Sequence, residues 1–166
     1  GAVLGGMMAI DMGGPVNKAA YVFGSGTLAA TMTSGGSLPM AAVMAGGMVP
    51  PIAIALASSI FKNKFTAEER EAGLTNYIMG FSFITEGAIP YAAADPTRVI
   101  PASVIGSAIA GALTGLFSIK IPAPHGGILV MALSNNFLLY LLAVVIGSIA
   151  AAFVLGFLKP AIKQEN

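Results

Sequence analysis

Two short segments of this chain carry side chains whose types and spacing allow chemistry. In the first, the Asp11 carboxylate, the Asn17 amide and the Lys18 ammonium flank a corner in the backbone. The corner consists of Gly13, Gly14 and Pro15. Residues of these types turn the backbone sharply and expose its peptide groups. We expect this set to hydrogen-bond several hydroxyls of a polar ligand. The alternative is an Asp11–Lys18 pair that only neutralises itself inside the protein.

The second segment surrounds Glu86, which stands alone among apolar residues. Thr85 precedes it, and Gly87 and Pro90 follow, a composition that suits a tight turn. Burial without a partner raises the pKa of a carboxyl group, and a raised pKa suits a general base that acts on a hydroxyl near neutral pH. We therefore predict that Glu86 is catalytic. The alternative is that it caps a half-helix or pairs with Lys18.

The single histidine, His125, lies in a loop rich in proline and glycine. We expect it to shape this loop, with a hydrogen bond to sugar or phosphate as the sharper alternative. One histidine without any cysteine argues against a zinc site, and we predict no metal and no cofactor. Asp95 or Thr97 is placed to cap a helix that begins near Val99.

The composition requires these residues to be held by a membrane protein. Hydrophobic residues make up 56% of the 166 and charged residues only 9%, whereas a soluble domain carries about 25% charge. A chain so poor in charge cannot cover a surface that faces water. A net charge of +1 gives no basic field for nucleic acid. We predict an all-α integral membrane fold.

Three stretches are long enough to span a bilayer as helices, namely residues 38–61, 99–119 and 137–158. Pro50 and Pro51 remove two backbone donors from the first, so a kink or break is expected there. Stripes of small residues at every fourth position predict close helix packing in the other two. The stripes consist of Ser103, Ser107, Gly111 and Gly115, and of Ala143, Gly147 and Ala151.

Residues 1–31 and 74–94 are apolar but contain the two chemical segments. Charged groups at membrane depth usually face a cavity, and broken backbone there must be buried or line water. We therefore predict two re-entrant hairpins or broken helices, the second joined near Thr85–Gly87. Cationic residues in 62–73 and in the tail, residues 159–166, place both segments in the cytoplasm. Thr66 and Glu69 form a capping box that predicts a short surface helix.

At these motifs the sequence resembles the fructose family of phosphotransferase-system (PTS) membrane subunits, enzyme IIC. The resemblance rests on residues 6–21, 84–96 and 124–127 and extends to about Leu158. It implies that residues 1–158 are the C-terminal, transport-domain half of a homodimeric subunit in the bacterial inner membrane. The missing half would form the dimer contact.

The resemblance also implies the roles of the site residues. The sugar would bind between the hairpin tips, where a phosphorylated IIB domain would phosphorylate fructose at its 1-hydroxyl. Asp11, Asn17 and Lys18 would belong to the first hairpin, and Glu86 would hold and activate the hydroxyl. Thr85 and His125 complete the expected substrate site. Relatives in the wider superfamily use a histidine near the first hairpin, which this chain lacks, and mannosylglycerate transporters share the family.

Two other functions fit the same residues. An ion-coupled secondary transporter would also use broken helices and a carboxylate at the membrane midplane, with Glu86 as the proton or sodium site. Sugar uptake that persists without IIB would favour it. A purely structural scaffold is the third possibility, and the charged Asp11 and Glu86 count against it.

Overall fold

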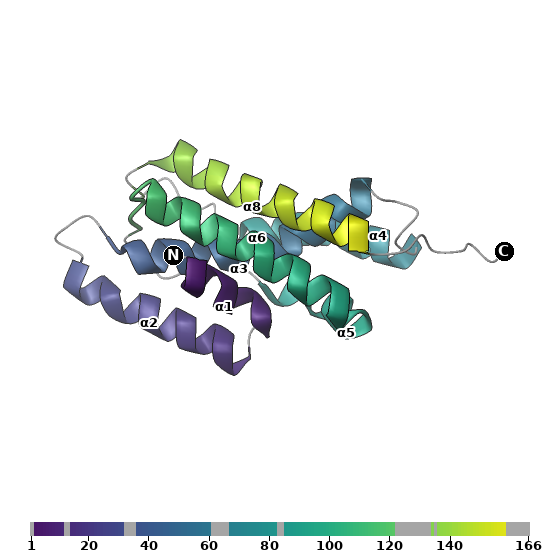
Figure 1. The fold of residues 1–166 in the computed structure, drawn as a ribbon, viewed down its shortest axis with the longest axis horizontal. Helices are drawn as coiled ribbons and strands as arrows, with labels where there is room; N and C mark the ends of the chain where they lie inside the picture. The colour runs from purple at the N-terminus through teal and green to yellow at the C-terminus, as the bar shows by residue number, and fades with distance from the viewer. Residues whose placement is uncertain are drawn as a thin grey trace.

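The computed structural model describes residues 2–11, 14–31, 36–60, 67–82, 85–121, 134 and 136–158. Within these ranges the chain is helical, and its extended contacts are limited to a bridge between Ser37 and Ile121. The elements are α1 (Ala2–Ile10), α2 (Pro15–Thr31), α3 (Leu38–Ile60), α4 (Ala67–Phe81), the 3-10 helix η3 (Thr85–Ala88), α5 (Ile89–Ala94), α6 (Pro96–Leu116) and α8 (Phe137–Leu158). Figure 1 shows α3, α6 and α8 running along the long axis of the molecule.

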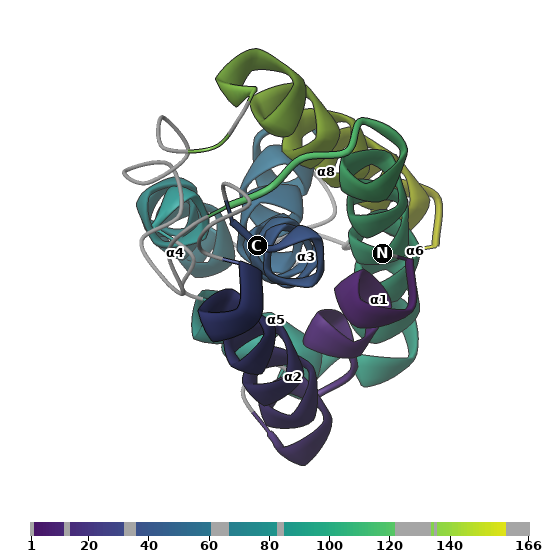
Figure 2. The same cartoon turned by 90° about the vertical axis from the view of Figure 1, so that its left-hand side faces the viewer.

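Helix α3 is the centre of the bundle. It packs against α1, α2, α4, α6, α8 and η3, and Figure 2 shows it surrounded by the helices among them. Its side chains are buried almost from end to end, because neighbouring helices cover every face. An apolar helix without a polar face suits this position, since it exposes nothing that needs water.

The predicted break at Pro50 and Pro51 is absent, because both prolines lie inside the continuous helix α3. Pro50 has no N–H to donate to the carbonyl of Gly46, which lies one turn earlier. The hydroxyl of Ser107 donates to this carbonyl instead, at 2.8 Å. A side chain from α6 thus satisfies an acceptor that the proline would otherwise leave unpaired inside the protein.

The three predicted spans are confirmed as helices long and apolar enough to cross a membrane. Helix α8 has the predicted bounds, whereas α6 begins and ends three residues earlier than predicted. It begins early because the Asp95 carbonyl accepts hydrogen bonds from the N–H groups of Arg98 and Val99. It ends early because Ser118 adopts a positive φ of 52°, which no helix continues.

Small residues bring α6 close to two neighbours. An added Cβ at Gly106 would lie 2.4 Å from the Gly147 carbonyl oxygen, so α6 and α8 touch backbone to backbone. The predicted α8 stripe is buried in this contact, but it faces Gly106 and Ala110 of α6. Ser107 and Gly111 of the predicted α6 stripe lie against α1, where a Cβ at Gly5 would lie 2.4 Å from the Ser107 carbonyl oxygen. Gly115 makes no such contact in the described part of the chain, where no atom lies within 4 Å of a Cβ added to it.

Both segments that carry polar groups are interrupted helices. The first breaks between α1 and α2, and the second breaks between α4 and η3, which α5 and α6 follow. Helix α4 begins at Ala67, where the capping box predicts a helix start, but it continues to Phe81 and is not the short surface helix that was expected. Thr66 and the tail, residues 159–166, lie outside the described residues. Whether either segment enters and leaves on one side of a membrane remains a prediction.

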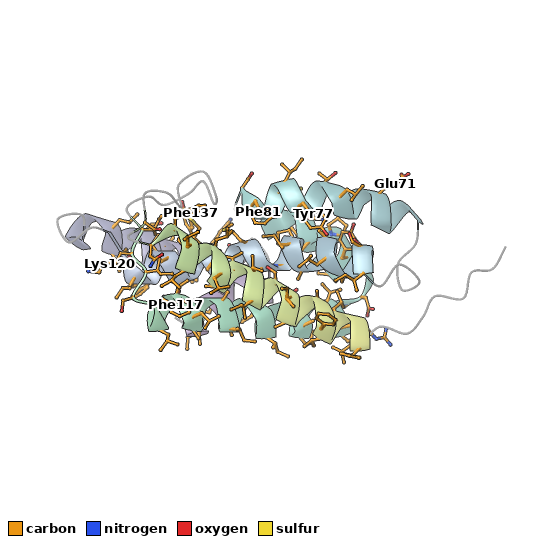
Figure 3. All side chains as sticks on the ribbon, turned by 90° about the horizontal axis from the view of Figure 1, so that it is seen from above. Glu71, Tyr77, Phe81, Phe117, Lys120 and Phe137 are labelled. Carbon is orange, nitrogen blue, oxygen red and sulfur yellow. The ribbon has the colours of Figure 1, made fainter. Side chains whose placement is uncertain are left out.

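Charged side chains gather at the ends of the bundle. Figure 3 shows Glu71 at one end, near the start of α4, and Lys120 at the other end, beyond α6. Arg98 pairs with Asp95 at 3.2 Å at the start of α6. Asp95 occupies the N-cap position as predicted, but its side chain forms no capping bond to the helix.

Candidate functional site

Asp11 caps the start of α2. Its carboxylate accepts hydrogen bonds from the N–H groups of Val16, at 2.8 Å, and Asn17, at 2.9 Å. These N–H groups lie in the first turn, where they have no partner within the helix, and the helix dipole favours a negative charge there. The backbone folds tightly around the carboxylate, because a Cβ at Gly14 would lie 2.7 Å from Asp11 Oδ2. The glycine corner therefore serves to wrap the chain around Asp11.

Asn17 joins the two helices of this first break. Its side-chain Nδ2 donates to the carbonyl oxygen of Met8 in the last turn of α1, at 2.8 Å, and the residue is 7% exposed. The carbonyls of a final helical turn have no helical donor, so this bond satisfies one of them. Asp11 and Asn17 together fix the angle between α1 and α2.

The predicted alternative in which Asp11 and Lys18 neutralise each other is wrong. Both residues belong to the described part of the chain, and they form no ion pair there. Lys18 is exposed, while the partners of the Asp11 carboxylate are backbone N–H groups. The Lys18 ammonium group is therefore not paired with the Asp11 carboxylate.

A pocket of about 220 Å³ joins the two interrupted segments. It is open to the exterior and lies between the end of α1, α5 and the start of α6. Its lining residues are Ile10, Asp11, Ile89, Ala92, Ala93 and Ile100. Asp11 is the charged group in this otherwise apolar lining. Each of its oxygens accepts one N–H bond, which leaves lone pairs that can accept further donors.

The second segment needs its glycine for a reason that the sequence did not reveal. A Cβ at Gly87 would lie 2.3 Å from the side-chain oxygen of Asn76 and 3.0 Å from the sulfur of Met79. Gly87 therefore allows α4 and η3 to approach closely. Pro90 lies in the first turn of α5, where its missing N–H leaves no helical hydrogen bond unmade.

Asn76 is a polar residue near this site that the sequence analysis did not select. It is 2% exposed, and its Oδ1 has no hydrogen-bond partner. The signal in the sequence is its spacing, because Gly73, Asn76 and Gly80 share one face of a helix. That face is the buried one, with an amide between two glycines.

The remaining predicted site residues are only partly described. Gly13 and His125 lie outside the described residues, as do the side chains of Thr85 and Glu86. The backbone of Thr85 and Glu86 forms the first half of η3. Among the described residues, no three histidine, cysteine or acidic side chains lie close enough together to hold a metal ion.

Curated relatives match the chain over nearly its whole length. It is 57% identical over 165 residues to the PTS system fructose-specific EIIABC component of Bacillus subtilis, covering 99% of this chain and 25% of that protein. It is 57% identical to the fructose permease IIC component of Bacillus amyloliquefaciens, covering 99% of this chain and 53% of the relative. It is also 52% identical to the PTS system fructose-specific EIIC component of Haloferax volcanii, covering 96% of this chain and 42% of that protein.

The chain thus spans at most about half the length of these relatives. No family model matches it, and no solved structure matches it. The relationship of this chain to the fructose-specific proteins is therefore shown by sequence identity. The apolar helices and these matches identify the chain as part of a multi-pass membrane protein, homologous to the EIIC membrane part of fructose-specific PTS proteins.

Proposed function

We propose that this chain is the C-terminal half of an EIIC subunit that binds fructose and moves it across the bacterial inner membrane while a IIB domain phosphorylates it. The single observation that carries this proposal is the pocket at which the two interrupted segments meet, with Asp11 in its wall. The names of relatives that combine IIB with IIC, such as the EIIB'BC component of Escherichia coli, support the IIB partner.

In this proposal the pocket residues and the other predicted site residues bind the sugar together. Asp11 accepts hydroxyl hydrogen bonds with the lone pairs that the cap leaves open. The isoleucine and alanine walls give the site an apolar lining, and a polar contact made against apolar walls is stronger than one in bulk water. Asn17, Lys18, Thr85 and His125 supply further hydrogen bonds to the sugar or its phosphate. This arrangement follows the usual pattern of small-molecule sites, with apolar walls and a few polar groups.

The chemical step belongs to Glu86. The 1-hydroxyl oxygen of fructose attacks the phosphorus of the phosphocysteine in IIB, and the hydroxyl proton passes to the Glu86 carboxylate. The new P–O bond forms as the P–S bond breaks, and the cysteine leaves as a thiolate. A general base of this kind contributes about 10²–10⁴-fold in rate. This half of the subunit supplies the sugar site, and IIB supplies the phosphoryl group.

The same proposal assigns the domain, the tail, the dimer contact and the substrate. Residues 1–158 form the transport-domain half, and residues 159–166 form a cytoplasmic tail. The other half of the subunit makes the contact within a homodimer. Fructose is the substrate that we favour over mannosylglycerate, because each of the three relatives reported above carries fructose in its name.

The test uses the complete subunit in inverted membrane vesicles with radiolabelled fructose. We expect fructose 1-phosphate to form only when phosphorylated IIB is supplied, and mannosylglycerate to compete weakly. Accumulation of free fructose without IIB, dependent on a proton or sodium gradient, would instead establish an ion-coupled transporter. Preferential phosphorylation of mannosylglycerate would change the proposed substrate, but the chain would still be part of a phosphotransferase membrane subunit.

A further inference from the structure

Asn76 lies in the narrow interface between α4 and the centre of the bundle. Of the α4 residues whose burial the structure describes, only Gly73, Asn76 and Gly80 are buried. The two glycines let α4 touch α3, since a Cβ at Gly73 would lie 2.4 Å from Ser58 Oγ and one at Gly80 would lie 2.4 Å from Ile52 Cγ1. Asn76 is the polar side chain enclosed by this contact.

Burial of the Asn76 amide costs free energy of folding. Its Oδ1 is buried without a donor, and such an acceptor loses its hydrogen bonds to water without replacement. An apolar side chain at this position would avoid that loss. Where a residue breaks the ordinary rule for a buried interface without a compensating contact, a functional role is the physical explanation to test.

The group that Asn76 faces is the turn that carries Glu86. Its Oδ1 lies against the backbone of Gly87, because a Cβ added there would be only 2.3 Å away. Gly87 belongs to η3, whose first N–H groups have no acceptor within the helix. The unpaired buried acceptor therefore lies beside a short helix whose first N–H groups are not used within that helix.

We propose that Asn76 is a positioning residue for the catalytic turn. When the sugar binds, η3 rotates slightly, and a backbone N–H of its first turn donates to Asn76 Oδ1. This bond fixes the peptide that carries Glu86 relative to the rigid pair α3 and α4. The inference rests on the proposed function, because it assigns Asn76 to the phosphoryl-transfer step of that function.

The test compares three variants in the complete subunit. Asn76→Ala removes the acceptor, and Asn76→Asp keeps an acceptor oxygen at nearly the same place. Ser148→Ala is the matched control, because Ser148 Oγ in α8 is likewise buried and unpaired. For each protein, the melting temperature in detergent, the KM for fructose and the kcat of phosphorylation by phospho-IIB are measured.

We expect Asn76→Ala to keep the wild-type melting temperature or exceed it, while kcat falls by at least about tenfold, the effect of a misplaced catalytic group. The KM should change less than kcat, Asn76→Asp should recover most of the rate, and Ser148→Ala should match wild type. A kcat for Asn76→Ala within twofold of wild type would overturn the inference. So would a joint loss of stability and rate that Asn76→Asp does not restore. An inactive wild type would count against the proposed function instead.

Discussion

The two interrupted segments meet at one pocket but differ in how their polar groups are satisfied. At the first, Asp11 caps α2 and Asn17 bonds to the end of α1, so the corner is held by its own hydrogen bonds. At the second, Asn76 keeps a buried acceptor unpaired against Gly87. A segment whose buried groups are paired keeps its shape without ligand, whereas one with an unpaired acceptor gains a bond by moving. We infer that the first segment supports the site and the second changes during the reaction.

Glu86→Ala should have the largest effect. It removes both the base and an acceptor for a sugar hydroxyl, and leaves the partner donors unpaired in an apolar pocket. Phosphorylation should fall by more than about 10⁴-fold, beyond the ordinary contribution of a general base. Fructose binding should also be lost. Equilibrium binding and single-turnover phosphorylation in vesicles measure both. A variant that binds fructose as well as wild type would show that Glu86 does not contact the sugar.

Gly87→Ala should have the next largest effect. It tests the close contact between α4 and η3. The added methyl overlaps Asn76 Oδ1, and overpacking of this kind costs about 1–3 kcal/mol. We expect a lower melting temperature and a lower rate of phosphorylation. In the Asn76→Ala background the same change should cost less, because the overlapping oxygen is gone.

The double-mutant cycle of Gly87→Ala and Asn76→Ala also provides the control for this contact. Ser148→Ala should show no coupling to Gly87→Ala, because Ser148 lies in α8, outside this contact. Additive losses for Gly87 and Asn76 would mean that the two residues do not touch in the working protein.

Asp11→Ala should have a smaller effect, which falls on both stability and fructose binding. It removes the acceptor for two first-turn N–H groups of α2, and loss of a helix cap costs about 0.5–2 kcal/mol. Asp11→Asn keeps one acceptor oxygen and should lose less. Thermal unfolding in detergent measures both variants. Because Asp11 also binds the sugar in the proposed function, fructose affinity should fall further than stability does. An unchanged melting temperature for Asp11→Ala would contradict the cap.

The spans were predictable because they depend on uninterrupted apolar length, which the sequence displays directly. The bounds of α8 followed from that length alone. The ends of α6 did not, since they depend on the Asp95 carbonyl and on the backbone of Ser118. The continuity of α3 through Pro50 was also hidden, because the donor that compensates for it, Ser107, lies 61 residues from the Gly46 acceptor along the chain.

The candidate site shows the same limit. The polar types around Asp11 and Glu86 were visible, and so was the need for a glycine after Glu86. The reason for Gly87 was not visible, because it depends on Asn76 reaching across from α4. The cap by Asp11 was missed because its carboxylate precedes the helix by several residues and reaches back through the glycine corner. Contacts between helices decide the roles of these residues, and the periodicity of apolar residues in the sequence does not reveal such contacts.

The most direct test of the account is Glu86→Gln, measured for sugar binding and for chemistry in the same vesicles. Glutamine keeps the size and hydrogen bonding of glutamate but cannot take the hydroxyl proton. Fructose binding should stay within about one tenfold step, or about 1.4 kcal/mol. Single-turnover phosphorylation by phospho-IIB should fall by about 10²–10⁴-fold. Phosphorylation at a near wild-type rate would contradict the account and leave Glu86 as a binding or packing residue.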